Sequence, residues 1–264
     1  MKIVVCAKHV PDIQAERRFT PEGRVDRGGG DGTVNEVDEN ALEAARRLAE
    51  AAGDDGGVEV VVLTMGPSQA VDAVRRGLQL GADSGVHVCD DALAGSDVFA
   101  TATVLAAAVR RLGDVDLVLV GMAALDSLTS LLPAALAEEL DLPALTIASA
   151  LSVEDGVVRV HRELDHAVEV LEAPLPALVS VTDGINNPRF PNFQVIMAAR
   201  GKPVETWSLA DLGLDAADVG HAAARTRVLE VTELAPREQE VRDADDDGRA
   251  GARLAEFLVA RGLA

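Results

Sequence analysis

The chain has 264 residues, of which 48% are apolar, and it carries a formal net charge of -20. This length and apolar fraction suffice for a full hydrophobic core, so we expect one large domain or two small ones. The negative charge argues against a nucleic-acid partner, because binding to phosphates requires clustered basic side chains. The small number of lysines, three in 264 residues, argues the same way.

The N-terminal sequence gives no sign of export. Lys8 interrupts the first apolar stretch early, which leaves it too short for a signal peptide, and no apolar run approaches the length of a membrane span. Cys6 and Cys89 lie far apart in apolar runs, which favours buried free thiols in a reducing compartment. These features predict a cytoplasmic protein that does not span a membrane.

The first half of the chain alternates predicted strands and helices. Strands rich in β-branched residues are expected at 2–7, 58–66 and 115–121. Helices are expected at 38–52, from Pro67 to Gly77, from a cap at Ser96 to Gly113, and at 126–140. This alternation predicts a mostly parallel sheet with helices on both faces, whose ligands bind at the carboxyl ends of the strands.

The pattern changes near residue 145. Residues 145–181 are typical of strands joined by short turns, one at Asp155-Gly156 and one near Asp165, so antiparallel strands are expected in the second half. The predicted fold is therefore a doubly wound α/β domain over 1–235. A C-terminal arm and helix are expected over 236–264.

Three loops at predicted strand ends form the candidate ligand site. They cover 6–8, 65–68 and 121–130, and each carries small or hydroxyl residues near a helix start. Free backbone N–H groups there would favour a phosphate. The alternative is that the polar side chains in these loops, Ser68, Asp126, Ser127 and Thr129, simply cap helices.

No catalytic or metal site is predicted. The five histidines lack metal-binding spacing, neither cysteine belongs to a CxxC pair, and the dinucleotide and phosphate-loop motifs do not occur in the candidate loops. We therefore expect a binding protein and not an enzyme.

The segment PRFPNF at 188–193 holds two of the chain's five phenylalanines among turn-forming residues. Phe190 and Phe193 either dock into a partner or pack back onto their own domain.

Several stretches in this order resemble the beta subunit of electron-transfer flavoproteins. They are KIVVCAKHVPD, NEVDENALEAARRL, TMGPSQAVDAVRRGLQLGAD, DLVLVG, LPALTIAS and NNPRFPNFQVIMAARGKP, and the resemblance covers nearly the whole chain. It implies a heterodimer in which an alpha subunit carries the redox-active FAD and the beta subunit holds AMP. It also implies that acyl-CoA or related dehydrogenases, as in fatty acid oxidation, reduce that flavin and that a membrane quinone oxidoreductase reoxidises it.

The resemblance also implies site residues. In the family a recognition loop, here 184–200, anchors dehydrogenases with one apolar side chain, whose position falls on Phe193, with Phe190 and Arg189 beside it. The terminal helix, with Leu254, Phe257, Leu258 and Leu263 on its apolar face, would pack on the alpha subunit or on its own core. The implied nucleotide pocket comprises Cys6, Asn35, Glu36, Val37, Asp38, Met65, Gly121, Met122, Ala123, Ala124, Leu125, Asp126, Ser127, Leu128, Thr129, Ser130, Leu131 and Leu132.

The chain departs from the family near the expected phosphate. Leu128, Leu131, Leu132 and Pro133 stand where many members have Gln, Thr or Gly. This leaves open a bifurcating subunit that holds a second FAD. The fold alone also permits a nucleotide-binding stress or signalling protein, or a nucleotide hydrolase.

Overall fold

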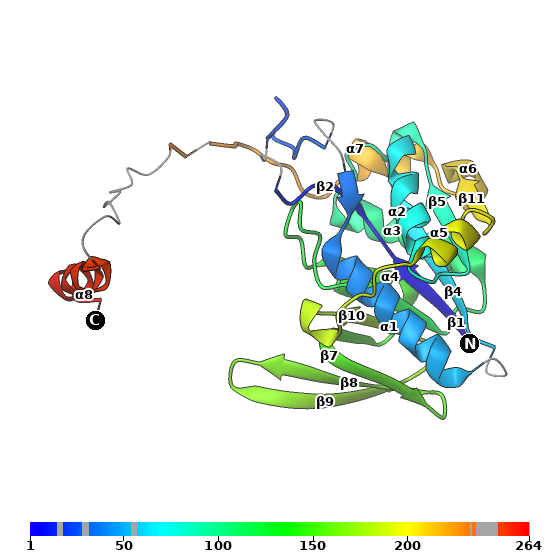
Figure 1. The fold of residues 1–264 in the computed structure, drawn as a ribbon. Coiled ribbons are helices and arrows are strands. Elements are labelled where there is room, and N and C mark those ends of the chain that lie inside the picture. The colour runs from blue at the N-terminus through cyan, green and yellow to red at the C-terminus, as the bar shows by residue number, and fades with distance from the viewer. Residues whose placement is uncertain (15–17, 28–31, 54–56, 233, 236–247, 264) are drawn as a thin grey trace. The chain divides into compact units, whose positions relative to one another are not determined.

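The computed structural model describes residues 1–14, 18–27, 32–53, 57–232, 234–235 and 248–263 (Figure 1). The chain divides into two compact units, Met1–Leu229 and Glu230–Ala264. The division falls N-terminal to the boundary after residue 235 that the sequence suggests, and residues 236–247 of the expected arm lie outside the described residues.

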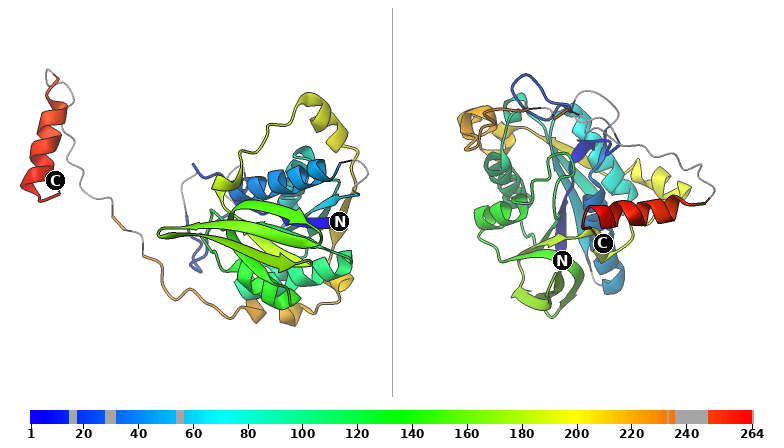
Figure 2. Two further views of the ribbon diagram at one scale, coloured as in Figure 1. Left: turned by 90° about the horizontal axis from the view of Figure 1, so that it is seen from below. Right: turned by 90° about the vertical axis from the view of Figure 1, so that its left-hand side faces the viewer.

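The first unit is built on a nine-stranded sheet with the order β11-β5-β4-β1-β6-β10-β7-β8-β9. The strands from β11 to β7 are parallel to their neighbours, and β8 and β9 add an antiparallel hairpin at one edge (Figures 1 and 2). The bounds of the strands are β1 Lys2–Cys6, β4 Glu59–Met65, β5 Ser84–Val88, β6 Leu117–Gly121, β7 Ala144–Glu154, β8 Val157–Leu164, β9 Ala167–Pro174, β10 Ala177–Val181 and β11 Val204–Trp207. A separate pair, β2 His9–Pro11 and β3 Gly32–Val34, lies beyond the carboxyl end of β1.

Helices cover both faces of the sheet (Figure 2). Successive residues of β1 point to opposite faces of the sheet and join two different hydrophobic cores. Ile3 and Val5 pack with α1 and α2, whereas Val4 and Cys6 pack with α3 and α4. This alternation is what a fully buried parallel strand requires. The helices are α1 Glu36–Ala52, α2 Val71–Gln79, α3 Val98–Leu112, α4 Leu132–Leu140, α5 Phe193–Ala199, α6 Leu209–Leu212, α7 Gly220–Ala223 and α8 Ala250–Ala260, with short 3-10 turns η2 Ser68–Ala70, η3 Asp91–Leu93, η4 Asp183–Ile185 and η5 Ala216–Asp218.

The predicted fold class is confirmed, with corrections to individual strands. β10 is not part of the antiparallel addition, because it pairs in parallel with β6 and β7 and all five of its residues are buried. β5 and β11 were not expected, since neither forms a long apolar run. The turns at Asp155-Gly156 and Asp165 are confirmed, because they join β7 to β8 and β8 to β9.

All four expected helix starts shift: α1 begins at Glu36 instead of residue 38, and α2 begins at Val71, after the 3-10 turn η2, instead of at Pro67. The other two shifts have a visible cause. The N-cap of α3 is Asp97, whose carboxylate accepts from the backbone N–H groups of Phe99 and Ala100, whereas Ser96 donates to a carbonyl instead. The fourth helix starts at Leu132 and not at Asp126, since Leu128 has a left-handed backbone with φ 51° that interrupts a helix.

The second unit contains α8, which has no buried residue. Leu254 and Leu263 are exposed, and Leu263 lies beyond the end of the helix. Among the helices that the structure describes, none is long and apolar enough to cross a membrane.

Candidate functional site

The carboxyl ends of β4, β1 and β6 lie side by side, because these strands are neighbours in the sheet. Met65 closes β4, Cys6 closes β1 and Gly121 closes β6. The loop 122–131 continues from β6 to α4, and the start of α1 lies against it. The predicted strand-end residues therefore do come together at one edge of the sheet, the upper end of β1 in Figure 1.

Two buried side chains at the start of α1 hold the loop in place. Asn35 donates from Nδ2 to the Ala123 carbonyl at 2.9 Å and accepts from the Leu125 N–H at 3.0 Å. Asp38 accepts from the Lys8 N–H at 2.8 Å and from the Gly121 N–H at 3.2 Å. Residues 35–38 thus set the position of both the β1 and the β6 strand ends.

Gly121 is required by this contact. A Cβ at Gly121 would collide with Asp38 Oδ1 and crowd the backbone of Val37. The close approach of β6 to α1 therefore depends on the missing side chain at this position.

Burial dominates the electrostatics of Cys6 and Asp38. It raises the pKa of Asp38 to about 7, although hydrogen bonds from the Lys8 and Gly121 N–H groups act in the opposite direction. Burial and the nearby Asp38 raise the pKa of the Cys6 thiol to about 12. Cys6 is free and buried, and because only the thiolate reacts, it is a neutral, unreactive thiol. Cys89 is also free but only half-buried.

Asp126 is the centre of an ion-pair cluster and not a helix cap. Its fully buried carboxylate lies 2.9 Å from Lys8 Nζ and 2.6 Å from Arg27 Nε. Burial alone would raise the pKa of Asp126, but the charges and hydrogen bonds of Lys8 and Arg27 outweigh it and lower that pKa. Two cations thus face one carboxylate at the strand ends of an otherwise strongly acidic chain.

The capping alternative is wrong for the other polar loop residues as well. Ser127 donates to Asp126, Thr129 donates to Ser127, and the N-cap position of α4 is Leu131, which makes no side-chain cap. Pro67, not Ser68, precedes the 3-10 turn after β4. Residues 127–131 are exposed, and Glu36 is exposed whereas Val37 is buried.

Sequence reasoning missed Lys8 as a side-chain participant and missed Arg27 entirely. Lys8 could have been found, since it is one of three lysines and follows a buried strand directly. Arg27 precedes β3, a strand that the sequence did not predict, and gave no such signal. Within the described residues, no group of three or more His, Cys, Asp or Glu side chains could hold a metal ion.

In chemical terms, the residues present fit the phosphate group of a nucleotide. Lys8 and Arg27 supply two positive charges against the one of Asp126, and the first N–H groups of α4 carry no side-chain cap. Basic side chains and uncapped N–H groups at a helix start each favour a nearby anion.

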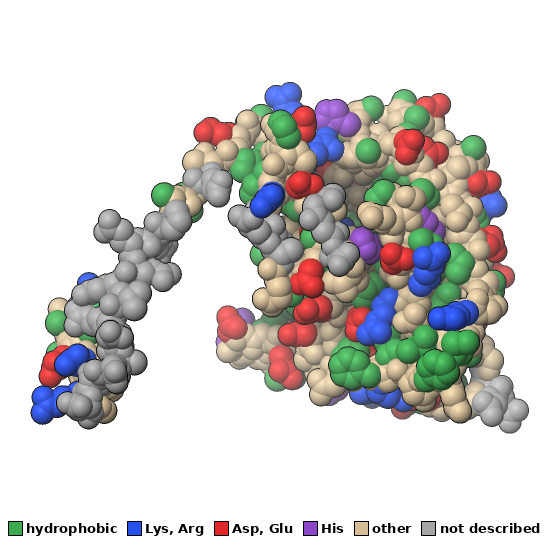
Figure 3. Space-filling model, turned by 45° about the horizontal axis from the view of Figure 1, so that its top comes forward, with side chains coloured by type: hydrophobic (Ala, Val, Ile, Leu, Met, Phe, Trp, Pro, Cys, Tyr) green, Lys and Arg blue, Asp and Glu red, His purple; other side chains and the backbone are tan. Residues whose placement is uncertain are grey.

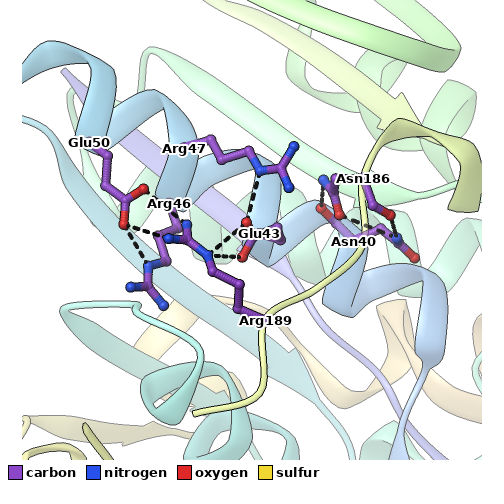
Figure 4. Close-up of polar contacts among 7 residues, drawn as sticks. All are labelled: Asn40, Glu43, Arg46, Arg47, Glu50, Asn186 and Arg189. Carbon is purple, nitrogen blue, oxygen red and sulfur yellow. Dashed lines mark hydrogen bonds and ion pairs between the residues drawn. The ribbon is translucent and has the colours of Figure 1, made fainter. Parts of the chain in front are cut away.

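The second candidate region is the loop 184–200. Phe190 is 92% exposed and Phe193 is 74% exposed, so the alternative that they pack back onto their own domain is wrong. Phe193 is also the first residue of α5 and not part of an irregular loop. Arg189 forms ion pairs with Glu43 and Glu50 of α1 (Figure 4), and a docking role for it stays a prediction.

Fold and site together define a doubly wound α/β protein with an ion-pair cluster at the carboxyl ends of parallel strands and an exposed aromatic surface on the loop 184–200. A family model described as the electron transfer flavoprotein domain matches residues 23–212. The electron transfer flavoprotein subunit beta of Mycobacterium leprae is 41% identical over 261 residues, which cover 98% of this chain and 98% of that protein. The chain belongs to the family of electron transfer flavoprotein beta subunits.

Two further relatives show the breadth of this similarity. The electron transfer flavoprotein subunit beta of Megasphaera elsdenii is 36% identical over 238 residues, 88% of this chain and 87% of that protein. The caffeyl-CoA reductase-Etf complex subunit CarD of Acetobacterium woodii is 36% identical over 229 residues, 87% of this chain and 86% of that protein.

Proposed function

We propose that this beta subunit, paired with an alpha subunit in the cytoplasm, docks acyl-CoA or related dehydrogenases so that their electrons pass through the FAD of the alpha subunit to a quinone oxidoreductase and the respiratory chain. The subunit does no bond chemistry of its own. It supplies the scaffold, a structural AMP and the docking surface.

One observation carries the docking part of this proposal: Phe193 and Phe190 are exposed on a chain that has six Phe and Trp residues in total and no Tyr. Exposed aromatic side chains are the usual anchors of protein–protein contacts, because a pocket that buries one gains roughly 2 kcal/mol or more. A single anchor of that strength suits a complex that must dissociate after each electron transfer.

The docking proposal is tested with Phe193→Ala in the purified heterodimer. We expect the KM for the heterodimer in its reduction by an acyl-CoA dehydrogenase to rise on the order of thirtyfold, the equivalent of about 2 kcal/mol. Phe19→Ala, which truncates an exposed aromatic side chain elsewhere, is the matched control and should leave the KM unchanged. Full electron acceptance by Phe193→Ala would contradict the proposal.

The AMP part rests on the strand-end cluster. The basic pair Lys8 and Arg27 would face the phosphate, while the backbone of 121–126, fixed by Asn35 and Asp38, would flank the adenosine. The leucines at 128, 131 and 132 leave few polar side chains in the loop, so backbone N–H groups would contribute much of the phosphate binding.

The relative from Acetobacterium woodii, named as a subunit of a reductase-Etf complex, favours a second candidate function. In this alternative the subunit holds a second FAD at the strand ends and takes part in electron bifurcation. The family membership argues against a stress or signalling protein and against a nucleotide hydrolase.

A further inference from the structure

The segment between η4 and α5 is tied to α1 at two points, although it has no regular structure of its own (Figure 4). The first tie is a reciprocal pair of amides. Asn40 donates from Nδ2 to the Asn186 carbonyl at 2.8 Å, and Asn186 donates from Nδ2 to the Asn40 carbonyl at 2.9 Å. Since Asn40 is buried, these bonds fix the start of the segment against the helix.

The second tie is the Arg189 guanidinium, which spans two carboxylates of α1. Its Nε donates to Glu43 at 3.0 Å, while Nη1 and Nη2 donate to the two oxygens of Glu50 at 3.1 and 3.0 Å. Glu43 and Glu50 share a face of α1 because their spacing amounts to about two helical turns. The planar fork of arginine suits such a double contact, and a lysine ammonium does not reproduce it.

Glu43 makes this tie stronger than an ordinary surface ion pair. Its side chain is 3% exposed, so it loses most of its hydration and depends on Arg189 and Arg47 for partners. Burial alone would raise the pKa of Glu43, but the hydrogen bonds from these two arginines outweigh it and lower that pKa. Removing Arg189 would leave a nearly buried carboxylate with one partner fewer.

The tied segment leads directly into the exposed aromatic residues. Phe190 follows Arg189, and the Asn192 side chain accepts from the Val195 N–H at 3.0 Å to start α5. Phe193 and Met197, one turn apart on α5, are both exposed. We call Phe190, Phe193 and Met197 the docking surface; Figure 3 shows hydrophobic side chains lying beside basic ones on this side of the domain.

We propose that Arg189 is a positioning residue, which with Glu43 and Glu50 holds the docking surface in a preformed conformation for an apolar pocket on the redox partner. This inference rests on the proposed docking function. The partner's pocket is apolar and not acidic, because the Arg189 charge is already neutralised by two carboxylates of its own chain.

We call the contacts of Arg189 with Glu43 and Glu50 the clamp. The clamp matters for affinity because a free segment would have to become ordered on binding. Ordering a free segment costs conformational entropy at each residue, and an untethered segment could also bury its phenylalanines elsewhere. Loss of the clamp should therefore weaken docking without affecting the electron-transfer step, since the flavin lies on the other subunit.

The test uses the intact heterodimer, reduced by an acyl-CoA dehydrogenase and its acyl-CoA. Arg189→Gln and Glu43→Gln should each raise the KM for the heterodimer roughly tenfold and leave kcat unchanged, as expected when preorganisation is lost. Arg46→Gln is the matched control: it removes a neighbouring ion pair to Glu50 but keeps Arg189 in place, and it should leave both constants unchanged. Hydrogen exchange of 186–199 should accelerate in the two clamp variants alone.

Glu43→Gln separates positioning from direct contact, because a side chain that is 3% exposed cannot reach a partner. A wild-type KM and wild-type exchange in Glu43→Gln would overturn the inference, even if Arg189→Gln binds poorly. If Phe193→Ala raises the KM and the clamp variants do not, the docking function stands and the clamp fails. If Phe193→Ala itself has no effect while the clamp variants accelerate exchange, the docking function fails instead.

Discussion

At the residue scale, the start of α1 shows why a few buried polar side chains determine the site. Asn35 and Asp38 lie in a helix start that the sequence marks by its acidic residues, yet their side chains point away from solvent and bind the backbone of two distant strand ends. Each satisfies N–H or carbonyl groups that the sheet leaves unpaired at its edge. A buried carboxylate in this position has a measurable consequence for stability.

Asp38 should make the stability of the domain fall as the pH rises. Burial raises the pKa of Asp38 from its ordinary value of 3.8 to about 7 in the folded chain, so between these pH values the folded state holds a proton that the unfolded state has released. Its stabilising contribution is complete below pH 4 and is lost as the pH rises to about 7, with a slope of at most about 1.4 kcal/mol per pH unit.

Asp38→Asn tests this directly, because asparagine cannot ionise. Urea unfolding at pH 5 and pH 8 should show that the variant loses less stability between these pH values than the wild type does. Any fixed cost of the amide cancels in this comparison. Equal losses in the two proteins would show that Asp38 is ionised throughout.

At the scale of elements, the sequence predicted those features that depend on local pattern. β1, β4 and β6 are long β-branched runs, and α1 and α3 end at glycines, so their positions could be read directly. β10 could not be assigned to its parallel neighbours, because pairing with β6 and β7 depends on a crossover that no local pattern encodes. Pro133, at the start of α4, was the available signal against a helix beginning at Asp126.

The candidate site was predictable to a similar extent. Strand-end loops follow from the parallel topology, so residues 6, 65 and 121–126 were expected together and are found together. The Lys8–Asp126–Arg27 cluster was not expected, because it joins three segments through side chains whose directions are set by tertiary structure. The exposure of Phe190 could not be decided either, since a phenylalanine in a loop is compatible with both burial and display.

Asp97 links two elements and gives a prediction at this scale. Besides capping α3, its Oδ2 accepts from the N–H groups of Arg225 and Thr226 at 2.8 and 2.9 Å, which fixes the chain after α7. Asp97→Ala should lower the free energy of unfolding by about 2 kcal/mol and speed tryptic cleavage after Arg225 and Arg227. Asp215→Ala, which removes the cap of the short turn η5, is the control and should leave that cleavage rate unchanged. Equal cleavage rates in the wild type and both variants would show that Asp97 does not hold the segment after α7.

At the scale of the whole molecule, the first unit carries both the proposed nucleotide site and the proposed docking surface. Both are built on α1: its N-terminal residues fix the strand-end loops, and Glu43 and Glu50 further along it fix the docking segment. The same helix thus places the two binding regions on one rigid support. A scaffold of this kind suits the proposed role, in which the flavin lies on the alpha subunit.

The nucleotides bound to the heterodimer decide whether this subunit holds AMP. The heterodimer should be purified, denatured and analysed for free nucleotides by chromatography and absorbance. We expect FAD and AMP in equal amounts, and we expect the AMP to be lost from the complex when Lys8 and Arg27 are both replaced by glutamine. Two FAD molecules per heterodimer and no AMP would contradict this expectation and would instead establish the bifurcating alternative.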